Sequence, residues 1–472
     1  MRRVCAASAL LIFACAGSTL GAQQPQALAV DIRVDPRIEL LSIVFRLAGN
    51  PEYSRAKVEK YAQAVDAHFA PCKDHAVVQL ARRLRARNGV GYDAVASMAV
   101  HLDGIDTLGL RGPSESRPER LDSRWATADA RTFLGHLRDF AGKSRCKAFF
   151  AAQAELYAHA EGQMRKVLSE HADLGWYDRF FGPRPGARFQ VVLGLLNGPS
   201  NFGPSVKLAQ DEELFAILGC WQTDAAGMPA FDAKVVPTLI HEFCHSYCNP
   251  VVDAHLRELL PAAEQIYVHV AAAMREQAYA NARTLLCESL VRACCVRYAA
   301  SVQGEQAARE AVAYEHGRSF LWTGELAALL AEYEQARSEY PTLDAFAPRL
   351  ARFFSEYAPK LAAAMAKKPK VSGMTPANGQ QDVDPGLTAL VITFDRPMQD
   401  QMWAVVGGGE HFPKLQGKPS YDAARKVLTI PVELRPDWEY ELWLNRGKYD
   451  SFRSADGEKL QPVHVKFRTR AR

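Results

Sequence analysis

The sequence lacks three patterns that would narrow its class of function at once. It has no lysine and arginine run interleaved with aromatics, and its net charge is only +4 over 472 residues, so nothing indicates a nucleic-acid partner. Beyond the N-terminus it has no apolar run of about 20 residues, the length that a membrane-spanning helix needs. Its cysteines show no CxxC spacing of the kind that zinc ribbons use. We therefore expect a soluble mature protein without a transmembrane segment.

Size and composition indicate a globular chain with more than one domain. The sequence is 48% hydrophobic and 23% charged, which is enough apolar material for a sizeable core. Single hydrophobic cores rarely grow beyond about 250 to 300 residues. A chain of 472 residues is therefore expected to fold as at least two domains.

The N-terminus has the pattern of a secretory signal peptide. Arg2 and Arg3 precede the apolar stretch 4–16, and small residues end at Ala22. We expect residues 1–22 to be removed on export to the periplasm or the outside. The alternative is a lipoprotein anchored through Cys15, but Phe13 stands where such signals prefer a small residue.

Eight cysteines follow this segment, an even number that permits disulfides in an exported protein. Their pairing does not follow from the sequence, and buried free thiols explain them equally well. The eight are Cys72, Cys146, Cys220, Cys244, Cys248, Cys287, Cys294 and Cys295.

Hydrophobic periodicity predicts an α+β protein whose first domain, residues 23–366, is mostly helical. Amphipathic spacing indicates helices over 54–70, 74–88, 127–142 and 146–171 and again through 251–366. A small sheet is predicted in between, from strands over 188–196, 205–208 and 213–221. The sheet comes directly before an apolar helix that begins near Val235.

A second domain is predicted from residue 371 to 472, after the sequence Lys-Lys-Pro-Lys at 367–370. Short alternating runs separated by Pro, Gly, Asn and Asp turns indicate a β-sandwich. The predicted strands are 389–394, 426–432, 440–444 and 463–468.

The motif His-Glu-x-x-His occurs at His241, Glu242 and His245. Residues four apart share a helix face, so both imidazoles can reach one ion while Glu242 lies beside it. Zinc with two histidines and a carboxylate keeps one position open for water. The motif predicts Zn²⁺ bound by His241 and His245, with Glu242 as the general base. Two ordinary histidines at a helix end are the simpler alternative.

The third ligand does not come from the extended metzincin pattern, because Cys248 and Val251 replace its glycine and last histidine. Zinc capture by Cys248 itself is a less favoured alternative, since Cys248 is seven residues from His241. Asn249 and Pro250 are expected to end the helix.

Glu288 is the predicted third ligand, as an isolated acid in an apolar segment where a buried carboxylate needs a partner. Arg292, one helical turn later, could orient it, although a surface arginine is equally plausible. The competing acids lie among other charges, as on a solvated helix face; they are Glu258, Glu264 and Glu276. The sequence does not choose a transition-state donor among Tyr298, Tyr314 and His316.

The motif HEFCHSYCNP at 241–250, the segment DPRIEL at 35–40 and Glu288 resemble the bacterial DUF4932 family over about residues 30–365. That family is similar to gluzincin peptidases. The resemblance implies a zincin-like fold, zinc ligation by His241, His245 and Glu288, and a base role for Glu242. It implies no substrate.

The C-terminal segments PANG at 376–379, VDP at 383–385 and ITFDRPM at 392–398 resemble bacterial Ig-like domains of the SbsA type. The resemblance implies a spacer, or a module that contacts a cell surface, protein or glycan. Chemistry is not expected there.

Together these patterns predict an exported zinc metallopeptidase that acts on a peptide or protein held along an edge strand within 205–220. Two alternatives stay open. One is a non-catalytic binding protein that uses the Ig-like domain. The other is a zinc hydrolase of a non-peptide amide.

Overall fold

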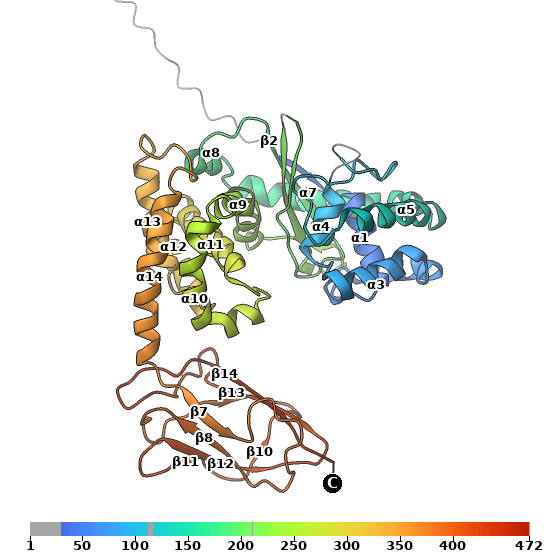
Figure 1. Ribbon diagram of the computed structural model, residues 1–472. Coiled ribbons are helices and arrows are strands. Elements are labelled where there is room, and N and C mark those ends of the chain that lie inside the picture. Colours follow the sequence, from blue (N-terminus) through green and yellow to red (C-terminus); the bar gives the residue numbers. More distant parts are fainter. Residues whose placement is uncertain (1–29, 112–116, 210, 472) are drawn as a thin grey trace, which may run out of the picture. The chain divides into compact units, whose positions relative to one another are not determined.

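The computed structural model describes residues 30–111, 117–209 and 211–471 (Figure 1). The predicted signal peptide and Cys15 lie outside these residues. The chain divides into two compact units, which meet in sequence between Val236 and Pro237. The α+β class predicted from the sequence is confirmed.

The N-terminal unit is mainly helical, with a four-stranded sheet and a short two-stranded hairpin among its described residues. Its helices are α1 (Pro36–Leu47), α2 (Glu59–Phe69), α3 (Ala76–Asn88), α4 (Asp93–Val100), α5 (Thr127–Lys143), α6 (Cys146–Ala152), α7 (Ala154–His171) and α8 (Trp176–Phe181). The helix predicted over 146–171 is two helices, because the backbone leaves the helical region at Gln153, with φ −99° and ψ 7°.

The sheet has four strands in the order β1-β2-β4-β3, namely β1 (Val30–Arg33), β2 (Ala187–Gly194), β3 (Ser205–Lys207) and β4 (Glu212–Gly219). β2 is parallel to β1 and to β4, whereas β3 is antiparallel to β4. The last six residues of both β2 and β4 are buried, as in strands covered on both faces. The predicted edge over 205–220 is therefore wrong for β4, which pairs on both sides. Within residues 205–220, β3 is the strand that lies at an edge of the sheet.

Two short strands, β5 (Gln222–Thr223) and β6 (Pro229–Ala230), form a hairpin after the sheet.

Helix α1 begins with a capping arrangement. The Asp35 side chain accepts a hydrogen bond from the Arg37 backbone N–H at 2.9 Å, and Pro36 occupies the first turn. The Arg37 guanidinium also pairs with Asp35, at 2.6 Å, and both side chains are buried. This part of the DPRIEL segment thus fixes where α1 starts.

Glu39 joins α1 to the end of the sheet. It is fully buried, and its carboxylate accepts hydrogen bonds from the Leu195 backbone N–H at 2.9 Å and from the Tyr61 hydroxyl at 2.7 Å. The Tyr61 hydroxyl lies 2.8 Å from that of Tyr157, so α2 and α7 are joined to the same point. Burial raises the pKa of Glu39 to about 7, despite the hydrogen bonds from Tyr61 and Leu195.

The C-terminal unit begins with helices: α9 (Val235–Ala254), α10 (Leu256–Glu276), α11 (Ala282–Val302), α12 (Glu305–Gly317), α13 (Thr323–Gln335) and α14 (Ala347–Lys367). α10 packs against α11 and α14, while α11 packs against α12 and α13 (Figure 1). α11 is thereby surrounded by neighbours, and 14 of its residues are buried. Among the described residues, no helix is long and apolar enough to cross a membrane.

The expectation that α9 ends at Asn249 and Pro250 is wrong, because the helix continues to Ala254. The turn after the proline is stabilised by burial, since Val251 and Val252 are only 7% and 2% exposed. The His255 N–H also bonds to the Val251 carbonyl at 3.1 Å. Tertiary packing thus outweighs the local cost of a proline within the helix.

The strands of residues 371–468 form two sheets. One has the order β10-β12-β8-β7, with β11 also paired to β12, and the other has the order β14-β13-β9. The strands are β7 (Val371–Thr375), β8 (Ala389–Phe394), β9 (Val405–Val406), β10 (Lys414–Leu415), β11 (Ser420–Tyr421), β12 (Val427–Glu433), β13 (Glu439–Leu444) and β14 (Val463–Arg468). The four predicted strands are confirmed to within one residue, while the domain limits stay a prediction.

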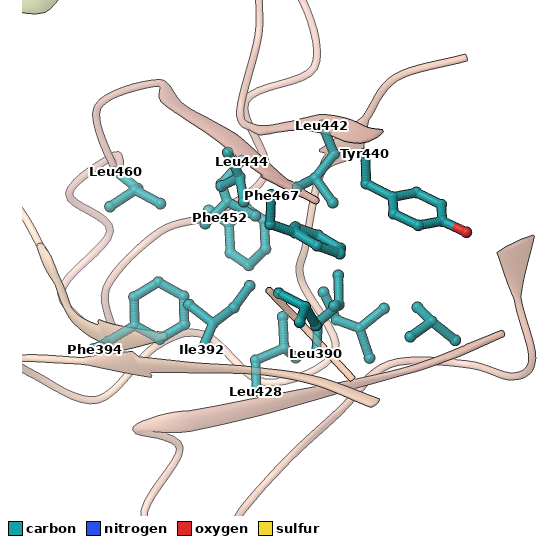
Figure 2. Close-up of a cluster of buried hydrophobic side chains, with 14 of the residues drawn as sticks. Leu390, Ile392, Phe394, Leu428, Tyr440, Leu442, Leu444, Phe452, Leu460 and Phe467 are labelled. Carbon is teal, nitrogen blue, oxygen red and sulfur yellow. The ribbon is translucent and has the colours of Figure 1, made fainter. Parts of the chain in front are cut away.

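One hydrophobic cluster lies between these sheets (Figure 2). Alternate residues of β8 and β12 point into it from one sheet, and alternate residues of β13 and β14 point into it from the other. Its labelled members include Leu390, Ile392, Phe394, Leu428, Leu442, Leu444 and Phe467. The alternation of apolar and polar residues along these strands therefore indicates that each sheet has one buried face.

Replacing Glu39 by Gln should remove a pH dependence of folding. An unfolded glutamate has a pKa of about 4.3, so between that value and about 7 the folded protein holds a proton that the unfolded chain has lost. The free energy of unfolding of the wild type should fall by about 3 kcal/mol as pH rises through this window. Urea unfolding at pH 4.5 and 7.5 measures the change.

The Glu39→Gln variant should lose most of this difference, while the exposed control Glu59→Gln should keep it. Equal pH dependence in the wild type and Glu39→Gln would contradict the role given to Glu39.

Candidate metal centre

Three side chains from two helices converge within the C-terminal unit. Their nearest ligand atoms are all separated by less than 4 Å: His245 Nε2 lies 3.2 Å from His241 Nε2, and the Glu288 carboxylate oxygens lie 3.6 Å from His241 Nε2 and 3.5 Å from His245 Nε2. α9 supplies both histidines and α11 supplies the glutamate. Within the described residues, no other group of His, Cys, Asp or Glu forms such a cluster of three.

These separations fit a single metal ion. Ligands held at 2.0 to 2.2 Å in a tetrahedral arrangement lie about 3.3 to 3.6 Å from one another, and the three measured separations are 3.2, 3.5 and 3.6 Å. The side chains of His241, His245 and Glu288 are 20%, 15% and 9% exposed. The three residues could therefore hold a metal ion that keeps some access to solvent.

Helix geometry explains how the histidines meet. Positions four apart lie one turn apart on the same face, and the two imidazole rings stand nearly perpendicular, at 85° with centroids 4.8 Å apart. Both Nε2 atoms point to the same place as a result.

Asn249 gives His245 a second contact that orients its ring. Asn249 Oδ1 lies 3.2 Å from His245 Nδ1, so the N–H on Nδ1 donates to the amide oxygen and the lone pair stays on Nε2, toward the other ligands. Asn249, which was expected to end the helix, instead lies within α9, four positions after His245 on the same face.

Arg292 orients Glu288, which decides the alternative left open by the sequence. It is 3% exposed, and its guanidinium donates to Glu288 Oε2 at 2.9 Å and to Glu315 Oε2 at 2.7 Å. The Phe320 ring covers it, with 4.5 Å between the guanidinium carbon and the ring centroid. A buried cation between two carboxylates fixes the rotamer of the predicted ligand.

Tyr279 also belongs to this network, although the sequence analysis missed it. Arg292 donates to its hydroxyl at 2.8 Å, and the nearby hydroxyl helps to lower the pKa of Glu288. The loop between α10 and α11 is held in place because the Tyr279 N–H bonds to the Met274 carbonyl at 2.9 Å and the Tyr267 hydroxyl donates to the Tyr279 carbonyl at 2.9 Å. Burial and the nearby Glu288 charge raise the pKa of Tyr279 to about 12.

The electrostatics favour the protonation states that metal binding requires. Burial lowers the pKa of His241 to about 3, although Glu288 opposes the shift. Burial raises the pKa of Glu288, but the nearby His241, His245 and Arg292 outweigh burial and bring it to about 2. Near neutral pH, His241 is therefore neutral and Glu288 is ionised, as a ligand pair must be.

Glu242 follows His241 on α9 and is 7% exposed. One residue corresponds to a turn of about 100° around a helix, so the carboxylate is on the side adjacent to the ligand face.

The three donors nominated from sequence lie on α11 and α12. Tyr298 is buried on α11, ten positions beyond Glu288. Tyr314 is 63% exposed with Arg318 over its ring, and His316 is exposed in the last turn of α12.

The competing acids Glu258, Glu264 and Glu276 are all exposed on α10, as a solvated helix face predicts. Cys248 is buried, with its sulfur against Cys294 rather than among the three ligands. Glu288 is thus the acid that the fold brings to the histidines.

Removing the Asn249 side chain should weaken metal binding without touching a ligand. Contacts that orient ligands typically contribute roughly 10- to 100-fold in affinity, so Asn249→Ala should raise the Kd for Zn²⁺ by about that factor. Asn249→Asp keeps an acceptor for His245 Nδ1 and should retain the affinity. Competition with a chromogenic chelator measures both, and equal affinities for wild type and Asn249→Ala would contradict the orienting role.

The chain matches the family model described as a domain of unknown function, DUF4932, over residues 30–353. This match covers more than half of the chain, and the protein therefore belongs to that family. No curated protein matches it.

Two solved structures of the S-layer protein SbsC match weakly. They are 12% and 14% identical to this chain, cover 50% and 51% of it, and each has a TM-score of 0.17. The matched part spans 34% of each S-layer chain. A TM-score this low does not support a shared fold.

Proposed function

We propose that this member of the DUF4932 family is an exported zinc-dependent peptidase. The observation that carries the proposal is the convergence of His241, His245 and Glu288 from two helices, with Glu242 next to His241 on the same helix. A purely structural metal needs no carboxylate beside the ligands, and structural zinc sites are usually closed by a fourth protein ligand. Three residues that could hold a metal ion lie together among the described residues, which supports an open site.

Zinc is the metal that this set of donors favours. Two imidazoles and one carboxylate are a common catalytic zinc set, and the spacing of the ligand atoms suits tetrahedral coordination. Zn²⁺ bound there would act as a Lewis acid and lower the pKa of water to about 7.

Different residues of the chain would then have different roles in amide hydrolysis. The Glu242 carboxylate takes a proton from the attacking water and delivers it to the leaving nitrogen. Asn249 keeps Nε2 of His245 unprotonated, and Arg292 with Tyr279 holds the Glu288 carboxylate in place. In this scheme Glu242 is the group that transfers protons, and it is not a metal ligand. It can therefore be changed without removing a ligand.

Export and the role of residues 371–472 belong to the same proposal. The charged and then apolar N-terminus supports secretion. The two sheets around one core support an Ig-like module, which would act as a spacer or contact a cell surface or glycan. A peptide or protein outside the cytoplasm is the expected substrate.

The decisive variant is Glu242→Gln, which keeps the size of the side chain but cannot take a proton. Loss of a general base costs roughly 10²- to 10⁴-fold in rate, so cleavage of a mixed peptide library, followed by mass spectrometry, should fall by at least about 100-fold. Metal content should stay unchanged. Glu258→Gln, on the exposed face of α10, is the matched control and should cleave like the wild type.

Two results would contradict the proposal. Cleavage that survives both Glu242→Gln and removal of the metal would belong to another site or a contaminant. A zinc-loaded wild type that cleaves no peptide would exclude the peptidase, and hydrolysis of a non-peptide amide by that same protein would reassign the substrate.

A further inference from the structure

The two helices that carry the ligands meet at a second point. Cys248 on α9 and Cys294 on α11 have their sulfur atoms 3.7 Å apart, and both residues are fully buried. Cys248 is three residues beyond His245, and Cys294 is six beyond Glu288. The contact therefore lies along the same helix pair as the metal centre, although neither thiol belongs to it.

We propose that Cys248 and Cys294 form a disulfide that cross-links α9 to α11. A disulfide holds its sulfurs about 2.05 Å apart, so the pair needs to close by about 1.7 Å from the 3.7 Å seen between the thiols. Rotation about the Cα–Cβ bonds of two facing cysteines moves their sulfurs by this amount. A thiolate metal site is the competing explanation, but no third His, Cys, Asp or Glu joins these two sulfurs among the described residues.

The reaction is a thiol–disulfide exchange with a small or protein disulfide as oxidant. With oxidised glutathione, one cysteine thiolate attacks a glutathione sulfur, forms a mixed disulfide and releases one glutathione thiolate. The second cysteine then attacks the mixed disulfide, closes the Cys248–Cys294 bond and releases the other glutathione. Two cysteine protons and two electrons end on two glutathione thiols.

Exchange has to occur while the chain is folding. Burial raises the pKa of both thiols in the folded protein, so few thiolates are present there and an oxidant cannot reach them. An exported chain folds in an oxidising compartment, where such bonds persist. The inference thus rests on the proposed export, but not on zinc or on catalysis.

The bond would hold the two halves of the metal centre together. It would close a chain segment of more than 40 residues, and cross-links across long segments remove much of the conformational entropy of the unfolded chain. His245 and Glu288 would stay near one another before any metal binds. The cross-link is therefore a positioning device for the ligands.

The test is oxidative refolding of the full chain in a glutathione buffer that contains EDTA, followed by alkylation of free thiols in denaturant and peptide mapping. We expect a cross-linked pair of peptides that contain Cys248 and Cys294, and recovery of both as alkylated thiols after reduction. Reduction should also lower the thermal midpoint by on the order of 5 °C or more.

Two variants serve as controls. Cys294→Ser should leave Cys248 alkylated and remove the shift in midpoint, whereas Cys146→Ser, a buried thiol on α6, should keep the cross-link. Should Cys294→Ser fail to fold, the peptide map of the wild type decides alone.

Alkylation of both Cys248 and Cys294 in the refolded wild type, or their recovery in bonds with other cysteines, would overturn the inference. EDTA keeps this result separate from zinc binding, which is measured on untreated protein.

Discussion

The buried ion pair of Glu288 with Arg292, beside the two imidazoles of α9, is the interaction around which the helices near α11 are arranged. A carboxylate with only 9% of its side chain exposed loses most of its hydration, and that loss is unfavourable unless donors or cations replace the water. Here the replacement comes chiefly from the Arg292 guanidinium, which donates to the carboxylate at 2.9 Å, together with the Tyr279 hydroxyl. The requirement to satisfy one buried charge thus dictates much of the surrounding arrangement.

The consequences extend through several helices. Arg292 needs a second acceptor, which α12 supplies through Glu315. Tyr279 is placed by a loop whose neighbour Gln277 exchanges hydrogen bonds with Arg318, after α12. The residue after Glu288, Ser289, accepts a hydrogen bond from the Trp322 indole at 2.8 Å. α10, α12 and α13 are therefore joined at the segment of α11 that holds the ligand.

The convergence of His241, His245 and Glu288 was predictable because each residue leaves a local signal in the sequence. His241 and His245 have helical spacing, and Glu288 is an isolated acid in an apolar run that long-range packing then buries. The strands of the C-terminal sheets were predictable for a similar reason, since their alternation is visible in short windows.

The residues that orient the ligands leave no such signal. Tyr279 lies in a loop nine positions before Glu288, and only the packing of α10 against α11 brings its hydroxyl to the carboxylate. The role of Asn249 was missed because the proline after it predicts a helix end. Burial of the two valines that follow keeps the helix going past this proline. The interior position of β4 was missed because pairing partners are not encoded in a single strand.

The most direct test of the account is the metal content of the purified protein, measured by elemental analysis in the wild type, His245→Ala and Glu288→Ala. The geometry predicts about one zinc ion per chain in the wild type and its loss in both variants, because each removes one of three ligands. No bound metal in the wild type after reconstitution, or equal metal in all three proteins, would contradict the assignment of this cluster as a metal centre.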